Sequence, residues 1–161
     1  MKRGKIIEAF RLINGIKMNV VTDKETRSAI IGNHLQMYKM AENHDNEVKE
    51  AYKKLFEGKE EDAQKVNELR QEFNTVGTTD ERKIEIVKEL TETYRPIIEL
   101  EVEFNKVVED MLNQDVDLNI VKLDKEAFVN ACADSGIEFT MVNILRIEEI
   151  FKSEEVEDTK E

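Results

Sequence analysis

Residues 78–113 read TTDERKIEIVKELTETYRPIIELEVEFNKVVEDMLN, and they show the clearest helical pattern in the chain. It opens with Thr78-Thr-Asp-Glu81, a capping box in which the hydroxyl and the carboxylate each accept a backbone N–H. Apolar residues then follow heptad spacing, interrupted only by Glu101: Val87, Leu90, Tyr94, Ile97, Phe104, Val108 and Met111. Pro96 removes one helical hydrogen bond but leaves this phase unchanged. The pattern therefore predicts one helix over residues 79–113, kinked at the proline.

A second long helical pattern precedes this stretch. Thr22-Asp-Lys-Glu25 is another capping box, and the pattern that it opens extends to about residue 56. Its apolar seam, in which Glu42 and Asp45 fill two positions, is Ile31, Leu35, Tyr38, Val48, Tyr52 and Leu55. Gly58 predicts a break or kink, after which residues 59–76 either continue this helix or fold back as a separate one. Together the two patterns predict a mainly α protein built on a long antiparallel helical hairpin with coiled-coil-like packing.

Shorter elements flank the hairpin. A helix is expected over residues 5–16, and a helix-loop-helix capped by Asp124 and Thr140 closes the fold. Residues 115–121 alternate between polar and apolar side chains, which is typical of a half-buried strand, and residues 18–21 are its best partner. We therefore expect a minimal two-stranded β element beside the helices.

The composition limits the domain organisation and the partners. The length of 161 residues suits one helical domain over residues 1–152, followed by an acidic, disordered tail over residues 153–161. The net charge is −12, from 36 acidic and 24 basic side chains, so direct binding to nucleic acid is not expected. No apolar run approaches the roughly 20 residues that span a bilayer, so no membrane contact is expected. Cys132 is the single cysteine, which leaves no disulfide within the chain and is typical of a cytoplasmic protein.

One run of polar residues has the spacing of a calcium site. The first, third, fifth and twelfth positions of an EF-hand loop would be Asp115, Asp117, Asn119 and Glu126. Calcium binding through these four side chains is one interpretation. The sixth position of such a loop needs glycine for a sharp turn, and Ile120 stands there instead. The strand interpretation also explains the apolar residues of the run, so we expect no metal and no cofactor.

No set of side chains predicts catalysis. Cys132 lies among apolar residues of a short predicted helix, which is typical of a buried core cysteine and not of a nucleophile. His34 and His44 are ten residues apart and do not form a metal-binding pair at helical spacing. The sequence has no glycine-rich phosphate loop and no nucleophile elbow. We therefore expect that the protein is not an enzyme.

The run Phe104-Asn-Lys-Val-Val-Glu-Asp-Met-Leu-Asn-Gln-Asp-Val-Asp-Leu-Asn-Ile-Val-Lys-Leu-Asp124 resembles a family of small phage and prophage proteins of unknown function. In that family a helix ends in a Leu-Asn turn and leads through an alternating acidic and apolar strand to two final helices. The order of elements in the whole chain is similar, although the hairpin tip is helical and lacks a glycine-rich insert. The resemblance implies a phage or prophage protein in the host bacterial cytoplasm or in the virion. It implies no catalytic residue and no cofactor.

Two long amphipathic helices have a narrow core and a large outer surface, so self-association or binding to a protein partner is the expected function. In a phage, that function would be virion assembly, at the tail or the head, or the role of an accessory factor. The alternative is an anti-defence inhibitor that binds a host protein, with an acidic surface that mimics DNA. An assembly factor should expose an apolar stripe, whereas a mimic should show two rows of carboxylates at near phosphate spacing.

Overall fold

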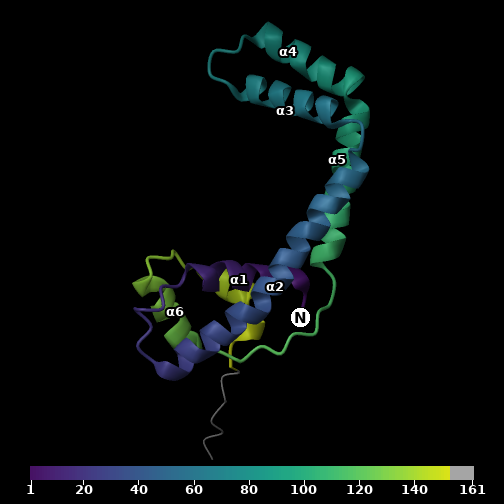
Figure 1. Ribbon diagram of the computed structural model, residues 1–161. Coiled ribbons are helices and arrows are strands. Elements are labelled where there is room, and N and C mark those ends of the chain that lie inside the picture. Colours follow the sequence, from purple (N-terminus) through teal and green to yellow (C-terminus); the bar gives the residue numbers. More distant parts are fainter. Residues whose placement is uncertain (153–161) are drawn as a thin grey trace, which may run out of the picture. The chain divides into compact units, whose positions relative to one another are not determined.

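The computed structural model describes residues 1–152, and this part of the chain is mainly α-helical, as predicted (Figure 1). The helices are α1 (Arg3–Gly15), α2 (Lys24–Leu55), α3 (Glu60–Asn74), α4 (Asp80–Lys88), α5 (Arg95–Leu112), α6 (Lys125–Asp134) and α7 (Met141–Arg146). A π-helical segment, Glu89–Thr93, separates α4 from α5, and a 3₁₀ turn, Glu148–Ile150, follows α7. The predicted acidic tail, residues 153–161, lies outside the described residues.

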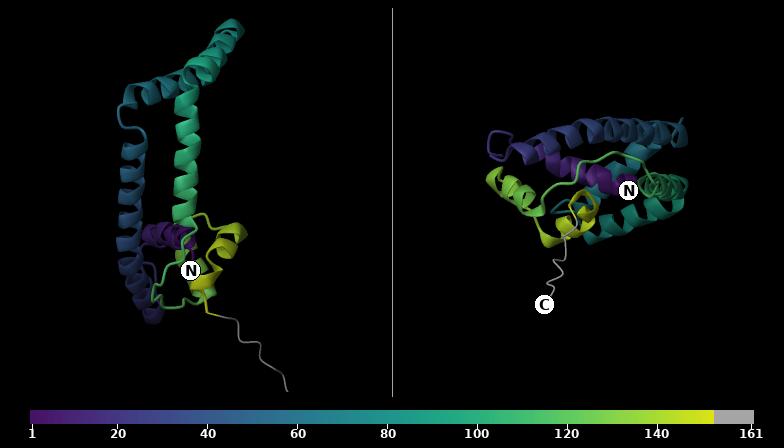
Figure 2. Two further views of the ribbon diagram at one scale, coloured as in Figure 1. Left: turned by 90° about the vertical axis from the view of Figure 1, so that its right-hand side faces the viewer. Right: turned by 90° about the horizontal axis from the view of Figure 1, so that it is seen from below.

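The chain forms two compact units. Within the described residues, unit 1 comprises residues 1–44 and 111–152, and unit 2 comprises residues 45–110. Helices α2 and α5 each continue from one unit into the other. The two views in Figure 2 let the helices of each unit be followed separately. The single domain expected over residues 1–152 stays a prediction.

Unit 1 has a large apolar core. Its buried side chains come from α1, α2 and α6, from the loop after α1, from the segment just before α6 and from the residues after α7: Ile6, Ala9, Ile13, Ile16, Val21, Ile30, Met37, Leu123, Phe128, Ala131, Cys132, Ile147, Ile150 and Phe151. Phe128 is fully buried and makes edge-to-face contacts with Phe139 and Phe151, with ring centroids 5.6 and 5.5 Å apart. Burial of one such side chain contributes about 1.5–3 kcal/mol. The hydrophobic effect is therefore the main force that holds unit 1 together.

Side-chain caps start three helices of unit 1, which are α2, α6 and α7. Asp23 caps α2 by accepting the N–H of Thr26 at 2.6 Å, so the cap lies one residue after the predicted Thr22. A carboxylate at this position also favours the positive end of the helix dipole, which explains the shift. The predicted caps of the last two helices are confirmed, because Asp124 caps α6 and Thr140 caps α7 through a capping box.

The predicted two-stranded β element is wrong, because no strand forms within the described residues. Residues 115–121 keep the predicted alternation, and their alternate apolar side chains pack against the core of unit 1: Val116, Leu118 and Ile120. Residues 18–20 form a turn and do not pair with this segment. Isolated bridges join the ends of the extended region to other segments, at Lys2–Asp115 and Leu123–Phe151.

The side chain of Asn33 takes the place of a neighbouring strand. Its amide nitrogen donates to the carbonyl of Val121 at 2.8 Å, and its amide oxygen accepts the N–H of Val121 at 2.9 Å. Asn33 is fully buried on α2, so both of these bonds satisfy polar groups that are removed from water. One carboxamide therefore positions the extended segment against α2 without a ladder of backbone hydrogen bonds.

Unit 2 contains the end of α2, all of α3 and α4, and most of α5. The helical pattern is interrupted at Gly58, which has a φ of 71°, as predicted. Helix α3 is a separate helix within residues 59–76. Gly77, with a φ of 103°, turns the chain from α3 to α4, and these two helices lie side by side (Figure 1). Both angles lie in the left-handed region, where glycine has no steric cost. The cap of α4 is Thr79, one residue after the predicted Thr78.

The single kinked helix predicted over residues 79–113 is wrong in one respect. Residues 89–93 are π-helical, and α5 follows as a separate helix. A π turn contains an extra residue, which shifts the buried face of α4 by one position relative to α5. Ile86 is therefore fully buried, whereas the predicted seam residue Val87 is 47% exposed. Pro96 lies in the first turn of α5, where its missing N–H leaves no intrahelical bond unmade.

The apolar core of unit 2 is small. Its buried cluster consists of Phe56, Ala63, Val66 and Ile97. The end of α2 packs on α5 through aromatic contacts, and the rings of Tyr52 and Phe104 meet edge to face at 5.4 Å. These contacts join α2 and α5 within unit 2, while the hairpin over their full lengths stays a prediction.

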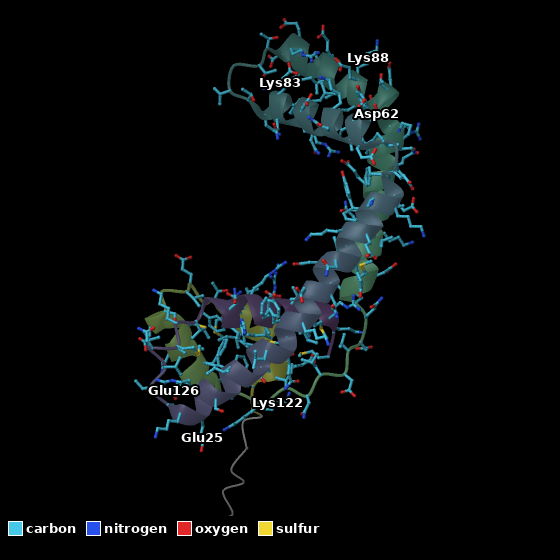
Figure 3. The ribbon with its side chains drawn as sticks, in the orientation of Figure 1. Glu25, Asp62, Lys83, Lys88, Lys122 and Glu126 are labelled. Atoms are coloured by element: carbon cyan, nitrogen blue, oxygen red, sulfur yellow. The ribbon has the colours of Figure 1, made fainter. Side chains whose placement is uncertain are left out.

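Ion pairs add to this core. Arg82 on α4 binds Glu72 on α3 at 2.7 Å and Glu89 at 2.9 Å. Arg70 on α3 forms a two-pronged pair with Glu101 on α5, at 2.9 and 2.6 Å. Figure 3 shows many other charged side chains on these helices, among them Asp62, Lys83 and Lys88. Unit 2 is thus held together by fewer apolar contacts and more charged ones than unit 1.

Candidate interaction surface on helix α2

Helix α2 has apolar residues on two adjacent faces. The first face is buried and follows steps of three and four residues: Thr26, Ile30, Asn33, Met37, Ala41 and His44. The polar Asn33 lies in its middle because it binds the backbone of Val121. This polar residue interrupts the apolar pattern, which is why the sequence prediction missed the face. Residues that bind an extended segment through a carboxamide leave no periodic signal in a sequence.

The second face is the seam predicted from the sequence, and in unit 1 it is exposed. Ile31, Leu35 and Tyr38 have 45%, 68% and 50% of their surface exposed, and we call these three residues the α2 stripe. One residue along a helix turns the side chain by about 100°, so Ile30 and Ile31 cannot both face the core. The bonds of Asn33 set the rotation of α2 and turn Ile30 inward. The predicted seam is therefore not part of the core of unit 1.

A cavity of about 180 Å³ borders the α2 stripe. Most of its lining is apolar and comes from the end of α1, the loop that follows and α2: Ile13, Ile16, Met18, Ile30, Ile31 and Leu35. Soluble monomers rarely expose contiguous apolar surface, and a hollow beside exposed apolar side chains is typical of a protein-binding surface.

Aromatic contacts fix the far end of the α2 stripe. The His34 ring nitrogen Nε2 is 3.0 Å from the amide oxygen of Asn14, and its ring lies 5.3 Å from Phe10. Tyr38 contacts both rings, at 6.4 Å from His34 and 6.1 Å from Phe10. These contacts restrict the rotamers of Tyr38 before any partner binds. Less conformational entropy is then lost on binding than for a free exposed side chain.

Charged side chains extend the same face of α2 in both directions. Lys24 and Arg27 precede the α2 stripe, and Glu42 and Asp45 follow it. Lys24, Glu42 and Asp45 are exposed. Arg27 is half-buried, and its Nε donates to the carbonyl of Val21 at 2.9 Å. The face is therefore basic at one end, apolar in the middle and acidic at the other end.

The structure does not gather the calcium candidates into a metal site. Asp115 pairs with Lys2 at 2.7 Å, and the hydrogen bond from this ammonium lowers the pKa of the carboxyl group. Glu126 lies exposed in the first turn of α6 (Figure 3). Across residues 1–152, no three His, Cys, Asp or Glu side chains are arranged to hold a metal ion. Asp117 and Asn119 are exposed members of the extended segment.

Cys132 is a core residue in the structure. It is fully buried in unit 1, and burial raises the pKa of its thiol to about 11. Such a thiol is protonated at neutral pH and is a poor nucleophile. Cys132 therefore packs within the core of unit 1.

A second cavity, of about 280 Å³, lies where α2 and α6 begin. Its lining includes Asp23 and Asp124, and both carboxylates already accept hydrogen bonds as helix caps. The hydrogen bond from Thr26 lowers the pKa of Asp23. Both carboxylates are engaged in capping, so we assign them a structural role.

The net charge is unevenly distributed between the units. Unit 2 has 19 acidic and 11 basic side chains, a net charge of −8. The described residues of unit 1 have 12 of each, a net charge of zero. Among the described helices, none has the length and apolar character needed to cross a bilayer.

No protein-family model matches the chain, and neither the curated proteins nor the solved structures compared with it include a significant match. The resemblance of residues 104–124 to a phage protein family stays a prediction. The proposed function is therefore based on the exposed surface of α2.

Proposed function

We propose that this protein acts by binding another protein through the α2 stripe and that it is not an enzyme. The observation that carries the proposal is the exposure of Ile31, Leu35 and Tyr38 beside an apolar cavity. Each Å² of apolar surface that a partner covers contributes roughly 25 cal/mol. An exposed stripe of three large apolar side chains is thus a favourable place for a contact, and it is the feature expected of an assembly factor.

We further propose that the contact serves a phage or prophage. The role would be virion assembly, at the tail or the head, or that of an accessory factor, in the host cytoplasm or within the virion. The resemblance of residues 104–124 supports this setting. The partner is a protein and not nucleic acid, because a net charge of −12 repels phosphate. The proposed contact needs no cofactor.

Two neighbouring substitutions test the proposal. Leu35→Glu places a charge on the α2 stripe, whereas Gln36→Glu places the same charge on an exposed residue about 100° away. Both positions are exposed, so both variants should keep the circular dichroism spectrum of the wild type. With tagged protein isolated from the cells that make it, Leu35→Glu should lose the bound partner and Gln36→Glu should retain it. Equal recovery from the two variants would contradict the proposal.

A second candidate function is supported by the charge of unit 2. An anti-defence inhibitor that mimics DNA would concentrate negative charge in one region, and unit 2 has a net charge of −8. Several of its carboxylates are already neutralised by arginine, among them Glu72, Glu89 and Glu101. These pairs leave fewer free carboxylates for a double row, which favours the α2 stripe as the binding surface.

One variant separates the two candidates. A triple change at the exposed start of α3, Glu60→Gln, Glu61→Gln and Asp62→Asn, removes three charges from unit 2. A DNA mimic would lose its host partner in this variant and keep it in Leu35→Glu. Binding through the α2 stripe predicts the reverse result in the same capture experiment.

A further inference from the structure

We propose that the partner of the α2 stripe is the α2 stripe of a second copy of this chain, bound antiparallel about a two-fold axis that passes between His34 and Leu35. The inference rests on the proposed function, because it names the occupant of the same surface. A contact of this kind uses one patch on both copies, so the patch must be complementary to itself.

The apolar residues of α2 meet this condition. In an antiparallel pair centred between residues 34 and 35, Ile31 faces Tyr38 of the second copy, and His34 faces Leu35 of the second copy. Ile31 and Tyr38 are seven residues apart, which keeps them on one side of a helix in a two-helix contact. Ile31 and Leu35, the two aliphatic side chains of the stripe, thus each meet a ring-bearing side chain from the other copy.

The charged residues meet the same condition in the same register. Arg27 faces Glu42 of the second copy, and Lys24 faces Asp45 of the second copy. The two-fold axis repeats each pair, so four ion pairs flank the apolar centre. A parallel alignment would instead place Lys24 against Lys24 and Asp45 against Asp45. Charge complementarity therefore favours a second copy of the chain as the partner and an antiparallel orientation of the two helices.

The cavity beside the α2 stripe lies within the proposed contact between the two copies. It is lined by Ile31 and Leu35 and has a volume of about 180 Å³. In the antiparallel register, Tyr38 of the second copy lies opposite Ile31, at the mouth of this cavity. Tyrosine is enriched in the centres of protein interfaces because its ring buries much apolar surface while its hydroxyl remains hydrogen-bonded. His34 and Phe10 already hold Tyr38 in place, which lowers the entropic cost of docking.

The size of the surface predicts a reversible dimer. From Lys24 to Asp45 the helix is about 32 Å long, at 1.5 Å per residue. Only three large apolar side chains per copy are exposed within this length. Interfaces with a small apolar centre and a charged rim are typical of transient association. We therefore expect monomer and dimer to exchange as the protein concentration changes.

Sedimentation equilibrium of the whole chain tests the self-association. Between about 1 and about 200 µM protein, the average mass should rise from the 18.8 kDa of one chain towards twice that value. Leu35→Glu should remain at the mass of one chain over this range, and Gln36→Glu should follow the wild type. A wild-type protein that stays monomeric throughout would overturn the inference, as would a Leu35→Glu variant that dimerises like the wild type.

A charge swap tests the antiparallel register. Lys24→Glu alone and Asp45→Lys alone should each weaken the dimer about tenfold, because two attractive pairs become repulsive. The double variant Lys24→Glu/Asp45→Lys restores opposite charges at both positions and should recover the wild-type dissociation constant. Both residues are exposed, and circular dichroism should show an unchanged fold. A double variant as weak as either single variant would overturn the register.

The same variants distinguish failure of this inference from failure of the proposed function. If the wild type is monomeric but Leu35→Glu still loses a different captured protein that Gln36→Glu retains, the proposed function stands and self-pairing is wrong. If the two variants behave alike in both experiments, the proposed function and the inference are both wrong.

Discussion

Units 1 and 2 are built from the same kind of helix and are stabilised by different forces. Unit 1 has a large apolar core around Phe128 and no net charge in its described residues. Unit 2 has a small core around Phe56, a net charge of −8 and arginine pairs that join its helices. Exposed or half-exposed ion pairs contribute little each, so unit 2 depends on several weak interactions. We therefore expect the two units to respond differently to cavities, lost hydrogen bonds and pH.

The largest expected effect comes from truncation of the core. Phe128→Ala leaves a cavity in a fully buried site of unit 1 and should lower the free energy of unfolding by about 3–5 kcal/mol. Phe56→Ala, its match in unit 2, should cost less, because the small core can collapse around the missing ring. Urea unfolding followed by circular dichroism measures the loss, and hydrogen exchange assigns it to a unit. Equal losses of unfolding free energy from the two variants would contradict the proposed difference between the cores of the two units.

A smaller effect is expected from Asn33. Asn33→Leu keeps a side chain of similar size but leaves the N–H and carbonyl of Val121 without their partner. An unsatisfied polar group costs about 1–3 kcal/mol, so the unfolding free energy should fall by about 2 kcal/mol. Hydrogen exchange at the Val121 amide should accelerate, while the amides of unit 2 stay protected. Asn43→Leu changes an exposed residue of the same helix and should leave Val121 exchange unchanged.

The smallest effect is expected in acid. Lys5 donates a hydrogen bond to Glu149 and lowers the pKa of that carboxyl group below its usual value of 4.5. A group whose pKa is lower in the folded state stabilises the protein above the unfolded pKa, and this contribution disappears as the pH falls through the folded pKa. Glu149→Gln should therefore be less stable than the wild type at pH 7, and the gap should close below a pH of about 4. Thermal unfolding of both proteins at each pH measures this gap.

A stability gap that does not depend on pH would contradict this role of Glu149. If the gap between wild type and Glu149→Gln stayed constant from pH 7 into acid, the ionised pair with Lys5 would not be the cause of the gap. The corresponding carboxyl group of unit 2 is Glu72, whose pKa is lowered by the hydrogen bond from Arg82. Glu72→Gln should likewise be less stable than the wild type at pH 7, and this gap should also close in acid. The change in hydrogen exchange should be confined to the amides of unit 2.

Local signals in the sequence predicted much of the fold. Caps at Asp124 and Thr140 and the break at Gly58 depend on a few neighbouring residues, and each of them is confirmed. The absence of a partner strand for residues 115–121 was not predictable in this way, because the backbone of Val121 binds the single side chain of Asn33 instead. An alternating pattern indicates which side chains face inward but says nothing about what binds the backbone.

The candidate site was predictable only in part. The spacing of Ile31, Leu35 and Tyr38 reveals an apolar stripe, but a second face of α2 beside it, with Ile30 and Met37, is also partly apolar. Contacts across unit 1 determine which of the two faces is buried. Met37 packs in the core, and Asn33 binds the backbone of Val121. The stripe was thus visible in the sequence, and its exposure became visible only in the structure.

Site-specific photo-crosslinking tests the role of the α2 stripe most directly. A benzophenone amino acid at position 35 replaces an exposed stripe residue, and the same group at position 36 serves as the control on the neighbouring face. Irradiation of the purified protein should give an adduct of twice the 18.8 kDa chain mass from position 35, with the crosslink mapped to α2 of the second copy. Position 36 should give little adduct. Absence of any adduct from position 35, in the purified protein and in the cells that make it, would contradict the assignment of the α2 stripe as a contact surface.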